Sequence, residues 1–292
     1  MPAPLLLLLA TIVRTDADTT VHLPRNGAIE IDSRSRDISL RIGTTDIVTI
    51  HGASAELDGG TLQLDGEDGR GPIELVVPAW AKVEATSIGG NLTFVGSPAR
   101  LHAETVNGFI HLTGGSGVVE LETVAGGVIV EGFHGLSLSI DATAENVSVT
   151  NASGDLEVDN VNGDVILRDI RSNTVSASNI NGLVQFDGVL APSGSYEFSS
   201  QNRDITLSLP VDVSATLRIS TMNGELTTQI PAVTNGMQGS GTPRAADKGK
   251  DKRRNSDADA DGEHTLTVVY GGGAARVAID AFNGNVIVKR RP

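Results

Sequence analysis

A short cassette, an apolar residue followed by Asn-Gly, returns along most of this chain of 292 residues. Five complete copies carry the dipeptides Asn107-Gly108, Asn162-Gly163, Asn181-Gly182, Asn223-Gly224 and Asn283-Gly284. The first apolar residue after each turn recurs every 18 to 21 residues, at Leu92, Ile110, Val128, Val147, Val165, Val184, Ile205 and Leu226. Self-similarity at a nearly fixed period is the signature of repeat architectures. The chain is therefore a repeat protein.

Apolar and polar residues alternate on both sides of each turn. Leu101 and Ala103 lead into the turn at Asn107, and Ile110 and Leu112 continue the alternation after it. A period of two places one apolar face on each short strand. With 34 glycines and only 3 % aromatic residues, the composition is typical of many short strands joined by tight turns. We expect an all-β chain with almost no helix.

Two arrangements satisfy this pattern. In a single-domain parallel β-solenoid, each repeat of 18–21 residues forms one coil, and the asparagines form a ladder along one edge. In an antiparallel meander or sandwich, each Asn-Gly is instead a two-residue hairpin turn. The near-constant period and the apolar residue before each Asn, which would stack in line, favour the solenoid. In both arrangements we expect Asn and Gly because they tolerate positive φ.

Three stretches depart from the regular repeat. Residues 1–17 contain an apolar run of about ten residues, which resembles the core of a signal peptide and is shorter than the roughly 20 residues of a transmembrane helix. Residues 18–80 alternate without Asn-Gly, which predicts an N-terminal capping β region. Within the repeats of 81–292, residues 231–263 are polar, glycine-rich and charged, which predicts a disordered insertion in one domain.

The net charge and the reactive side chains exclude several classes of partner and site. A formal net charge of −14 argues against nucleic acid and anionic lipid as partners, and the lack of cysteine excludes disulfides and thiolate zinc sites. His102 and His111 could approach each other across one turn, but no acid or nucleophile matches them, so we predict surface residues. We expect no catalytic residue and no cofactor.

One segment has the spacing of a calcium-binding loop. It places a carboxylate at every second position and ends in Gly262. Val268 stands where the bidentate acid of such a loop is required, so we interpret the segment as a solvated acidic run. The candidate calcium ligands are Asp257, Asp259 and Asp261.

The cassettes, the segment Asp18-Thr19-Thr20 and the run from Gly271 to Val277 before Phe282-Asn283-Gly284 resemble the bacterial putative-adhesin repeat family. This is a domain of unknown function found in cell-envelope proteins. The resemblance covers most of residues 18–292 apart from the insertion. It implies a β-helix-like fold and export to the envelope, and it supplies no catalytic residue.

We therefore expect an exported, non-enzymatic β-repeat protein, located in the periplasm or outside the cell. It would act as an adhesin or envelope scaffold that presents an extended surface to polysaccharide or protein. One alternative is a carbohydrate-active enzyme on a β-helix, which requires at least two acids gathered in a groove. Another is a regulatory partner in envelope stress, which would need a transmembrane neighbour that this chain lacks.

Overall fold

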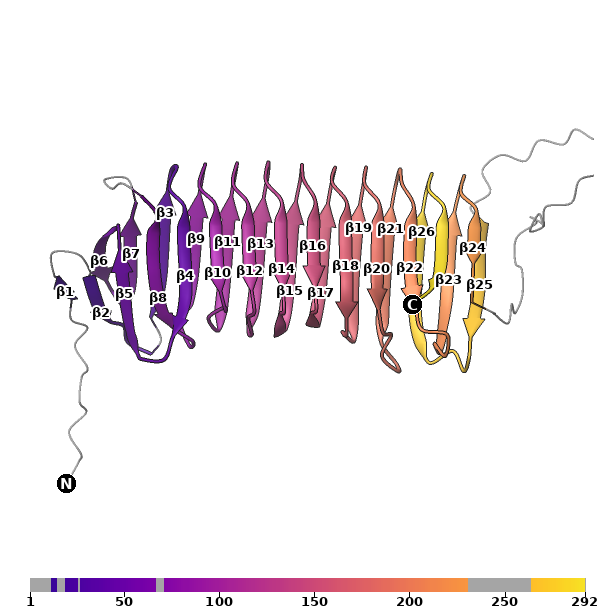
Figure 1. Cartoon of the computed structure of the whole chain (residues 1–292), viewed down its shortest axis with the longest axis horizontal. Coiled ribbons are helices and arrows are strands. Elements are labelled where there is room, and N and C mark those ends of the chain that lie inside the picture. The colour runs from indigo at the N-terminus through magenta and orange to yellow at the C-terminus, as the bar shows by residue number, and fades with distance from the viewer. Residues whose placement is uncertain (1–11, 15–18, 26, 67–70, 231–263, 292) are drawn as a thin grey trace, which may run out of the picture.

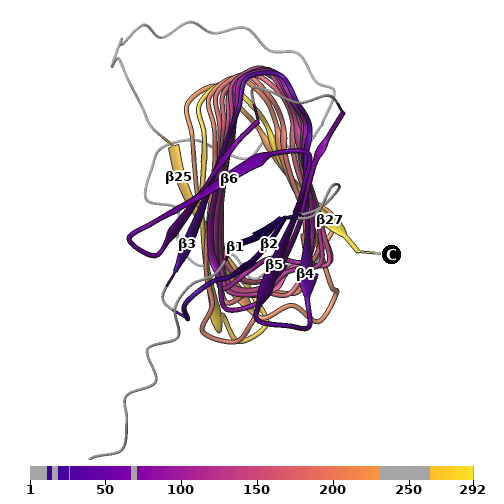
Figure 2. The ribbon, with the colours of Figure 1, turned by 90° about the vertical axis from the view of Figure 1, so that its left-hand side faces the viewer.

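The computed structural model describes residues 12–14, 19–25, 27–66, 71–230 and 264–291. These residues form 27 strands and no helix, which confirms the all-β prediction. They build two large mixed sheets, sheet A with 14 strands and sheet B with 13, which face each other along the length of the molecule (Figures 1 and 2). Most of the predicted signal peptide and the whole predicted insertion lie outside the described residues.

Each sheet follows one continuous strand order. Sheet A runs β1 (Ile12–Arg14), β2 (Thr19–His22), β5 (Ile47–His51), β8 (Ile73–Pro78), β4 (Ile38–Gly43), β10 (Leu92–Val95), β12 (Ile110–Thr113), β14 (Val128–Glu131), β16 (Val147–Thr150), β18 (Val165–Ile170), β20 (Val184–Gly188), β22 (Ile205–Leu209), β27 (Val286–Arg290) and β24 (Leu226–Thr228). Sheet B runs β25 (His264–Tyr270), β23 (Ala215–Thr221), β26 (Ala275–Ala281), β21 (Ser195–Ser200), β19 (Thr174–Asn179), β17 (Ser153–Asn160), β15 (His134–Ala142), β13 (Val118–Thr123), β11 (Arg100–Thr105), β9 (Lys82–Ser87), β3 (Ala28–Ser33), β7 (Thr61–Asp65) and β6 (Ser54–Asp58).

In the regular region the chain alternates between the two sheets. β11 of sheet B leads through the Asn107-Gly108 turn into β12 of sheet A. β11 pairs in parallel with β9 and β13, whereas β12 pairs in parallel with β10 and β14. The strands on either side of an Asn-Gly turn therefore do not pair with each other, and the hairpin alternative is wrong for this region. A sheet B strand, its turn and the following sheet A strand are called a coil below.

The core lies between the two sheets. In one regular coil, Leu101 and Ala103 of β11 and Ile110 and Leu112 of β12 are fully buried. These are the residues that the alternation placed on the inner face. Burial of one aliphatic side chain stabilises a protein by about 1.5–3 kcal/mol. Because each regular coil buries a similar set of such side chains, the coils contribute similar amounts to the stability of the fold.

Aromatic side chains pack in the core at β20 and β21. The ring of Phe186 lies 6.1 Å from that of Tyr196 and 5.2 Å from that of Phe198. The Tyr196 hydroxyl donates a hydrogen bond to the carbonyl oxygen of Ser172 and accepts one from the backbone amide of Ala191, both at 2.7 Å. Burial raises the pKa of Tyr196, although the hydrogen bond from Ala191 acts in the opposite direction.

Antiparallel strands lie at both ends of the described stack. At the N-terminal end β2 and β5 pair antiparallel in sheet A, and β6 pairs antiparallel with β7 in sheet B. β3 pairs in parallel with β9, and β4 with β10, so both sheets continue without a break across residue 80. At the other end, β25 pairs antiparallel with β23.

The last coil of the chain stacks out of sequence order. β26 lies between β21 and β23 in sheet B, and β27 lies between β22 and β24 in sheet A (Figure 1). All four pairings are parallel. Residues 275–290 are therefore inserted between two coils that precede them in the sequence.

Candidate binding surfaces

The Asn-Gly turns stack above one another along one edge of the molecule. No Asn or Gly of the five cassettes has positive φ in the structure, so the conformational reason expected for these residues is wrong. A Cβ atom added to Gly182 would lie 1.9 Å from the carbonyl oxygen of Gly163, and one added to Gly108 would lie 2.0 Å from that of Gly90. At these glycines the neighbouring coils approach so closely that a Cβ atom would force the backbone to shift. The same approach brings Gly163 onto Glu145, Gly284 onto Arg203, and Gly224 onto Gly284.

A column of buried polar side chains supports these turns from inside. The Thr105 hydroxyl accepts a hydrogen bond from the amide of Gly108 at 3.2 Å and donates one to the carbonyl oxygen of Gly90 at 3.1 Å. Asn179 makes the corresponding bonds with its amide oxygen at 3.0 Å and its amide nitrogen at 2.6 Å. The signal missed in the sequence is a Ser, Thr or Asn three residues before the glycine position. Its buried members are Ser33, Ser87, Thr105, Thr123, Asn160, Asn179 and Ser200.

Asparagine side chains of five neighbouring turns form a ladder. In the order Asn223, Asn283, Asn202, Asn181 and Asn162, the Nδ2 of each of the first four donates to the Oδ1 of the next, at 2.8–3.1 Å. Asn162 ends the ladder and donates to the carbonyl oxygen of Thr143 at 2.8 Å. Asn107 stands outside this run and donates to the carbonyl oxygen of Ile88 at 3.2 Å. Because the ladder amides bond to one another, these side chains stabilise the edge.

The apolar residue at the turn position before the asparagine, or before the equivalent Gly89 or Ala125, is at least partly exposed, with Val106 and Val161 half-buried. The turns are joined by backbone hydrogen bonds, such as that from Asn107 N to Ile88 O at 3.0 Å, so equal positions do stack in line. The line, however, points to solvent and forms an exposed apolar ridge, which the sequence pattern did not reveal. The exposed fractions are 52 % for Ile88, 49 % for Val124, 36 % for Ile180, 49 % for Phe282 and 40 % for Met222.

Carboxylates stack in register on the outer face of sheet B. Glu104, Glu122, Asp141 and Asp159 are direct partners on four consecutive strands, β11, β13, β15 and β17. Partners on adjacent strands lie about 4.8 Å apart. Partial burial raises the pKa of Asp141, and the negative charge of Asp159 raises it further. This acidic line therefore disfavours anionic partners.

A groove of about 1000 Å³ lies at the N-terminal end of sheet B. Asp32 of β3 and Asp65 of β7 are direct cross-strand partners there, which places their Cα atoms about 5 Å apart. The sequence showed no such gathering of acids, because the two strands are brought together only by the fold. Other polar residues that line the groove are Glu30, Arg34, Ser54, Glu56 and Gln63.

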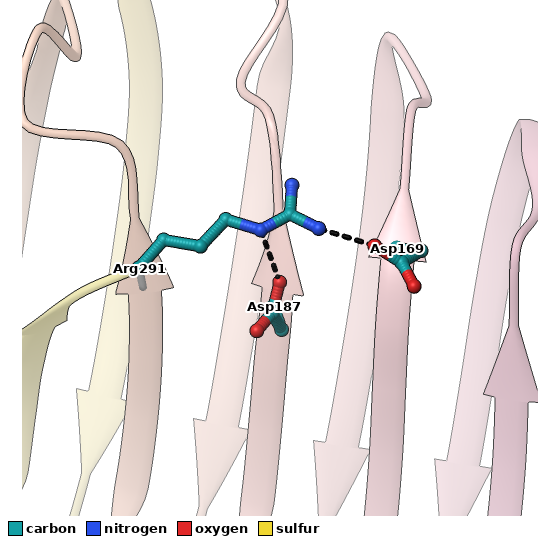
Figure 3. A network of polar contacts seen from close by, with 3 residues as sticks. All are labelled: Asp169, Asp187 and Arg291. Carbon is teal, nitrogen blue, oxygen red and sulfur yellow. Dashed lines mark hydrogen bonds and ion pairs between the residues drawn. The ribbon is translucent and has the colours of Figure 1, made fainter.

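An ion-pair cluster joins the last coil to earlier ones on sheet A. Nε of Arg291 lies 2.8 Å from Oδ1 of Asp187, and the guanidinium also contacts Asp169 (Figure 3). The side chains of Arg291 and Asp187 are 24 % and 25 % exposed. Arg291 and Asp169 are 122 residues apart, so no local pattern could have predicted this contact.

The remaining candidate residues do not form a site. His102 lies on sheet B, 3.4 Å from Glu120, whereas His111 lies on sheet A, 3.7 Å from Glu131. The two histidines therefore occupy different sheets, and the proximity considered from the sequence is wrong. Within the described part of the chain, no three His, Cys, Asp or Glu residues are grouped to hold a metal ion. The candidate calcium ligands fall outside that part, namely Asp257, Asp259 and Asp261.

Three solved structures are similar to this chain. A putative adhesin from Parabacteroides merdae is 12 % identical with a TM-score of 0.38, over 66 % of this chain and 89 % of that one. A putative lipid binding protein from Parabacteroides distasonis is 10 % identical with a TM-score of 0.41, over 94 % and 97 %. A putative cell adhesion protein from Clostridium sporogenes is 10 % identical with a TM-score of 0.18, over 97 % and 98 %.

No family model and no curated protein matches the sequence. Two of the three structures bear names in keeping with the adhesin resemblance of the sequence. At these similarities, the function has to be argued from this chain's own residues. Across the residues that the structure describes, no helix is present that could cross a membrane.

Proposed function

We propose that this chain is an exported, non-catalytic β-solenoid that acts as an adhesin or envelope scaffold. It presents the outer face of sheet B to a neutral or cationic polysaccharide, or to a protein. The observation that carries this proposal is the register of the outward side chains. Equal positions of successive coils are direct strand partners, so the same chemistry repeats in a straight line about every 4.8 Å.

The parallel pairing of successive coils supports the solenoid. Leu92, Ile110 and Val128 are direct partners although each is 18 residues from the next. One repeat therefore advances the chain by one strand spacing in both sheets, as a coil of a solenoid does. The ladder of turn asparagines follows from the same stacking.

The outer face of sheet B offers chemistry suited to an extended polymer. The acidic line continues from Asp159 to the hydroxyls of Ser178 and Ser199, which are direct partners on the next strands. Carboxylates accept hydrogen bonds, and serine hydroxyls both donate and accept them. A row of such groups can bind the hydroxyls or amines of a polymer, whereas its negative charge repels phosphate and uronate groups.

A second candidate function is that of a carbohydrate-active enzyme. It is favoured by the pairing of Asp32 and Asp65 in the groove, because glycoside hydrolysis uses two carboxyl groups on either side of the scissile bond. In that case the groove, and not the flat face, would hold the glycan. The two proposals therefore place the ligand on different residues.

A binding screen separates these functions. The full chain is tested against neutral, amino-containing and anionic glycans, together with a Glu122→Gln/Asp141→Asn/Asp159→Asn variant. We expect binding to neutral or amino-containing glycans, reduced at least about tenfold in that variant, because each lost charge-assisted hydrogen bond costs about 1.5 kcal/mol or more.

The matched control carries Ser148→Ala and Gln185→Ala on the outer face of sheet A, and it should bind like the unmodified chain. Equal loss in both variants would contradict the assignment to sheet B, and no binding to any glycan would contradict a polysaccharide as the ligand. Release of new reducing ends from a bound glycan, abolished by Asp32→Asn, would instead support the enzyme.

A further inference from the structure

The inserted C-terminal coil occupies a slot made entirely by earlier residues. One wall of the slot is the coil of β21 and β22, and the other is the coil of β23 and β24. Both walls bond to β26 and β27 through parallel ladders over their full lengths. Within the described chain, β21 and β23 have no ladder to each other. The inserted coil bonds to both, and residues 210–214 connect β22 to β23 along the chain.

The inserted coil matches the slot in its core and at its edge. Val277, Ile279, Val286 and Val288 are at most 2 % exposed, so they continue the core across the slot. At the edge, Asn283 donates to Asn202 at 3.1 Å and accepts from Asn223 at 2.8 Å. The asparagine ladder is thus continuous only through this coil.

Gly284 matches the close spacing of the two walls. A Cβ atom on Gly284 would lie 1.9 Å from the carbonyl oxygen of Arg203 on one wall. From the other wall, a Cβ atom on Gly224 would lie 1.8 Å from the carbonyl oxygen of Gly284. A glycine at this position therefore fits between the two walls as they stand, whereas a Cβ atom there would force the backbone of the Arg203 wall to move.

We propose that this slot is a binding site for a C-terminal coil, and that a second copy of the chain supplies it in a reciprocal, coil-exchanged dimer. Residues 264–291 of each copy move to the other copy, where β26 and β27 fill the slot and β25 pairs with the far edge of β23. Because donor coil and slot lie at the same end of the stack (Figure 1), the exchange is mutual and closes as a two-fold symmetric pair.

The connection to the inserted coil is long enough for exchange. Residues 231–263 separate Ile230 from His264, and a chain of this length reaches up to about 110 Å when extended. The exchanged coil makes the same contacts as the coil of the same copy. The two forms therefore differ mainly in that a coil of the same copy is covalently linked to its slot, which gives it an effective concentration of the order of millimolar.

Arg291 opposes release of the coil. It reaches from the end of the inserted coil across β22 to Asp187 of β20 and to Asp169 of β18. In the exchanged dimer the same ion pairs form between the two copies. Removal of the guanidinium therefore accelerates exchange without altering the slot.

The experiment uses cysteine cross-linking of the full chain, which has no native cysteine. Ser199 of β21 and Asp280 of β26 are direct partners on the outer face of sheet B. A Ser199→Cys chain and an Asp280→Cys chain are mixed at about millimolar concentration, unfolded, refolded together and treated with a short bismaleimide. The control mixture pairs Ser199→Cys with Ser139→Cys, because β15 does not belong to the exchanged coil.

We expect a covalent dimer of the first mixture, in at least about tenfold excess over the control mixture, with a yield that falls on dilution below the effective concentration. In folded chains mixed without denaturant, Arg291→Ala should speed its appearance. The double variant Ser199→Cys/Asp280→Cys should cross-link within one chain in dilute solution, which verifies the register. If that internal link forms but the mixed dimer does not exceed the control after refolding, the exchange proposal is overturned.

Discussion

Gly182→Ala tests whether close approach of the coils explains the glycine of the cassette. The new Cβ atom would lie 1.9 Å from the carbonyl oxygen of Gly163, whereas ordinary contact begins at about 3.4 Å. The two atoms must therefore separate by roughly 1.5 Å. That carbonyl also accepts a hydrogen bond from Asn179 at 2.6 Å, so it cannot withdraw without loss of this bond.

The expected cost follows from these contacts. Forcing an extra methyl group into a packed region costs about 1–3 kcal/mol. Stretching the bonds of Asn179 to the carbonyl of Gly163 and to the amide of Gly182 adds about 1 kcal/mol for each bond lost. We therefore expect the free energy of unfolding to fall by about 3–5 kcal/mol, a large part of the 5–15 kcal/mol typical of native proteins.

Urea unfolding followed by circular dichroism measures this change. Glu145→Ala is the matched control, because Glu145 occupies the same turn position two coils away and already carries a side chain. It should cost less than about 0.5 kcal/mol. Gly182→Asn separates the two explanations: a demand for positive φ would tolerate asparagine, whereas close approach makes it as harmful as alanine. A cost below about 1 kcal/mol for Gly182→Ala would refute the reasoning.

Three further predictions concern titration and the buried polar column. Asp141→Asn should raise the free energy of unfolding by about 0.5 kcal/mol at neutral pH. The raised pKa of Asp141 means that its ionised form costs stability as the pH rises, so this gain should vanish near pH 3, and an equal gain there would contradict the prediction. Burial raises the pKa of Tyr196 and Tyr270, so both favour the fold below the ordinary pKa of about 10 and lose that contribution above it. In an alkaline titration followed by ultraviolet absorbance, phenolate should appear only as the chain unfolds. Ionisation of both tyrosines near the ordinary pKa in the folded chain would contradict this prediction. Asn179→Ala should cost about 2–3 kcal/mol in urea unfolding because it leaves buried backbone groups unpaired, and an equal cost for Ser178→Ala on the outer face would contradict this role.

Several sequence predictions concern residues or properties that the described structure does not test. The signal peptide at 1–17, the insertion at 231–263 and the absence of enzymatic activity stay predictions. The acidic run that includes Asp257 also stays an interpretation. For the described residues, the comparison between sequence and structure is more informative.

Local pattern determined the strands and their inner faces. Leu101 and Ala103 are buried because strand side chains alternate with a period of two, and this period depends only on neighbouring residues. The asparagine ladder could be anticipated as well, since equal positions of a regular repeat must lie above one another once the coils stack. An all-β chain with a stacked Asn-Gly edge was therefore present in the amino-acid sequence.

Tertiary structure alone decided how the coils meet. Each cassette offers nearly the same register to every other, so the sequence could not show that the coil containing Asn283 lies between those of Asn202 and Asn223. The close approach at Gly182, the pairing of Asp32 with Asp65, and the exposure of the apolar ridge likewise depend on distances between separate coils or strands. A repeating pattern specifies what each coil can bind, whereas the order of stacking selects which coil it binds.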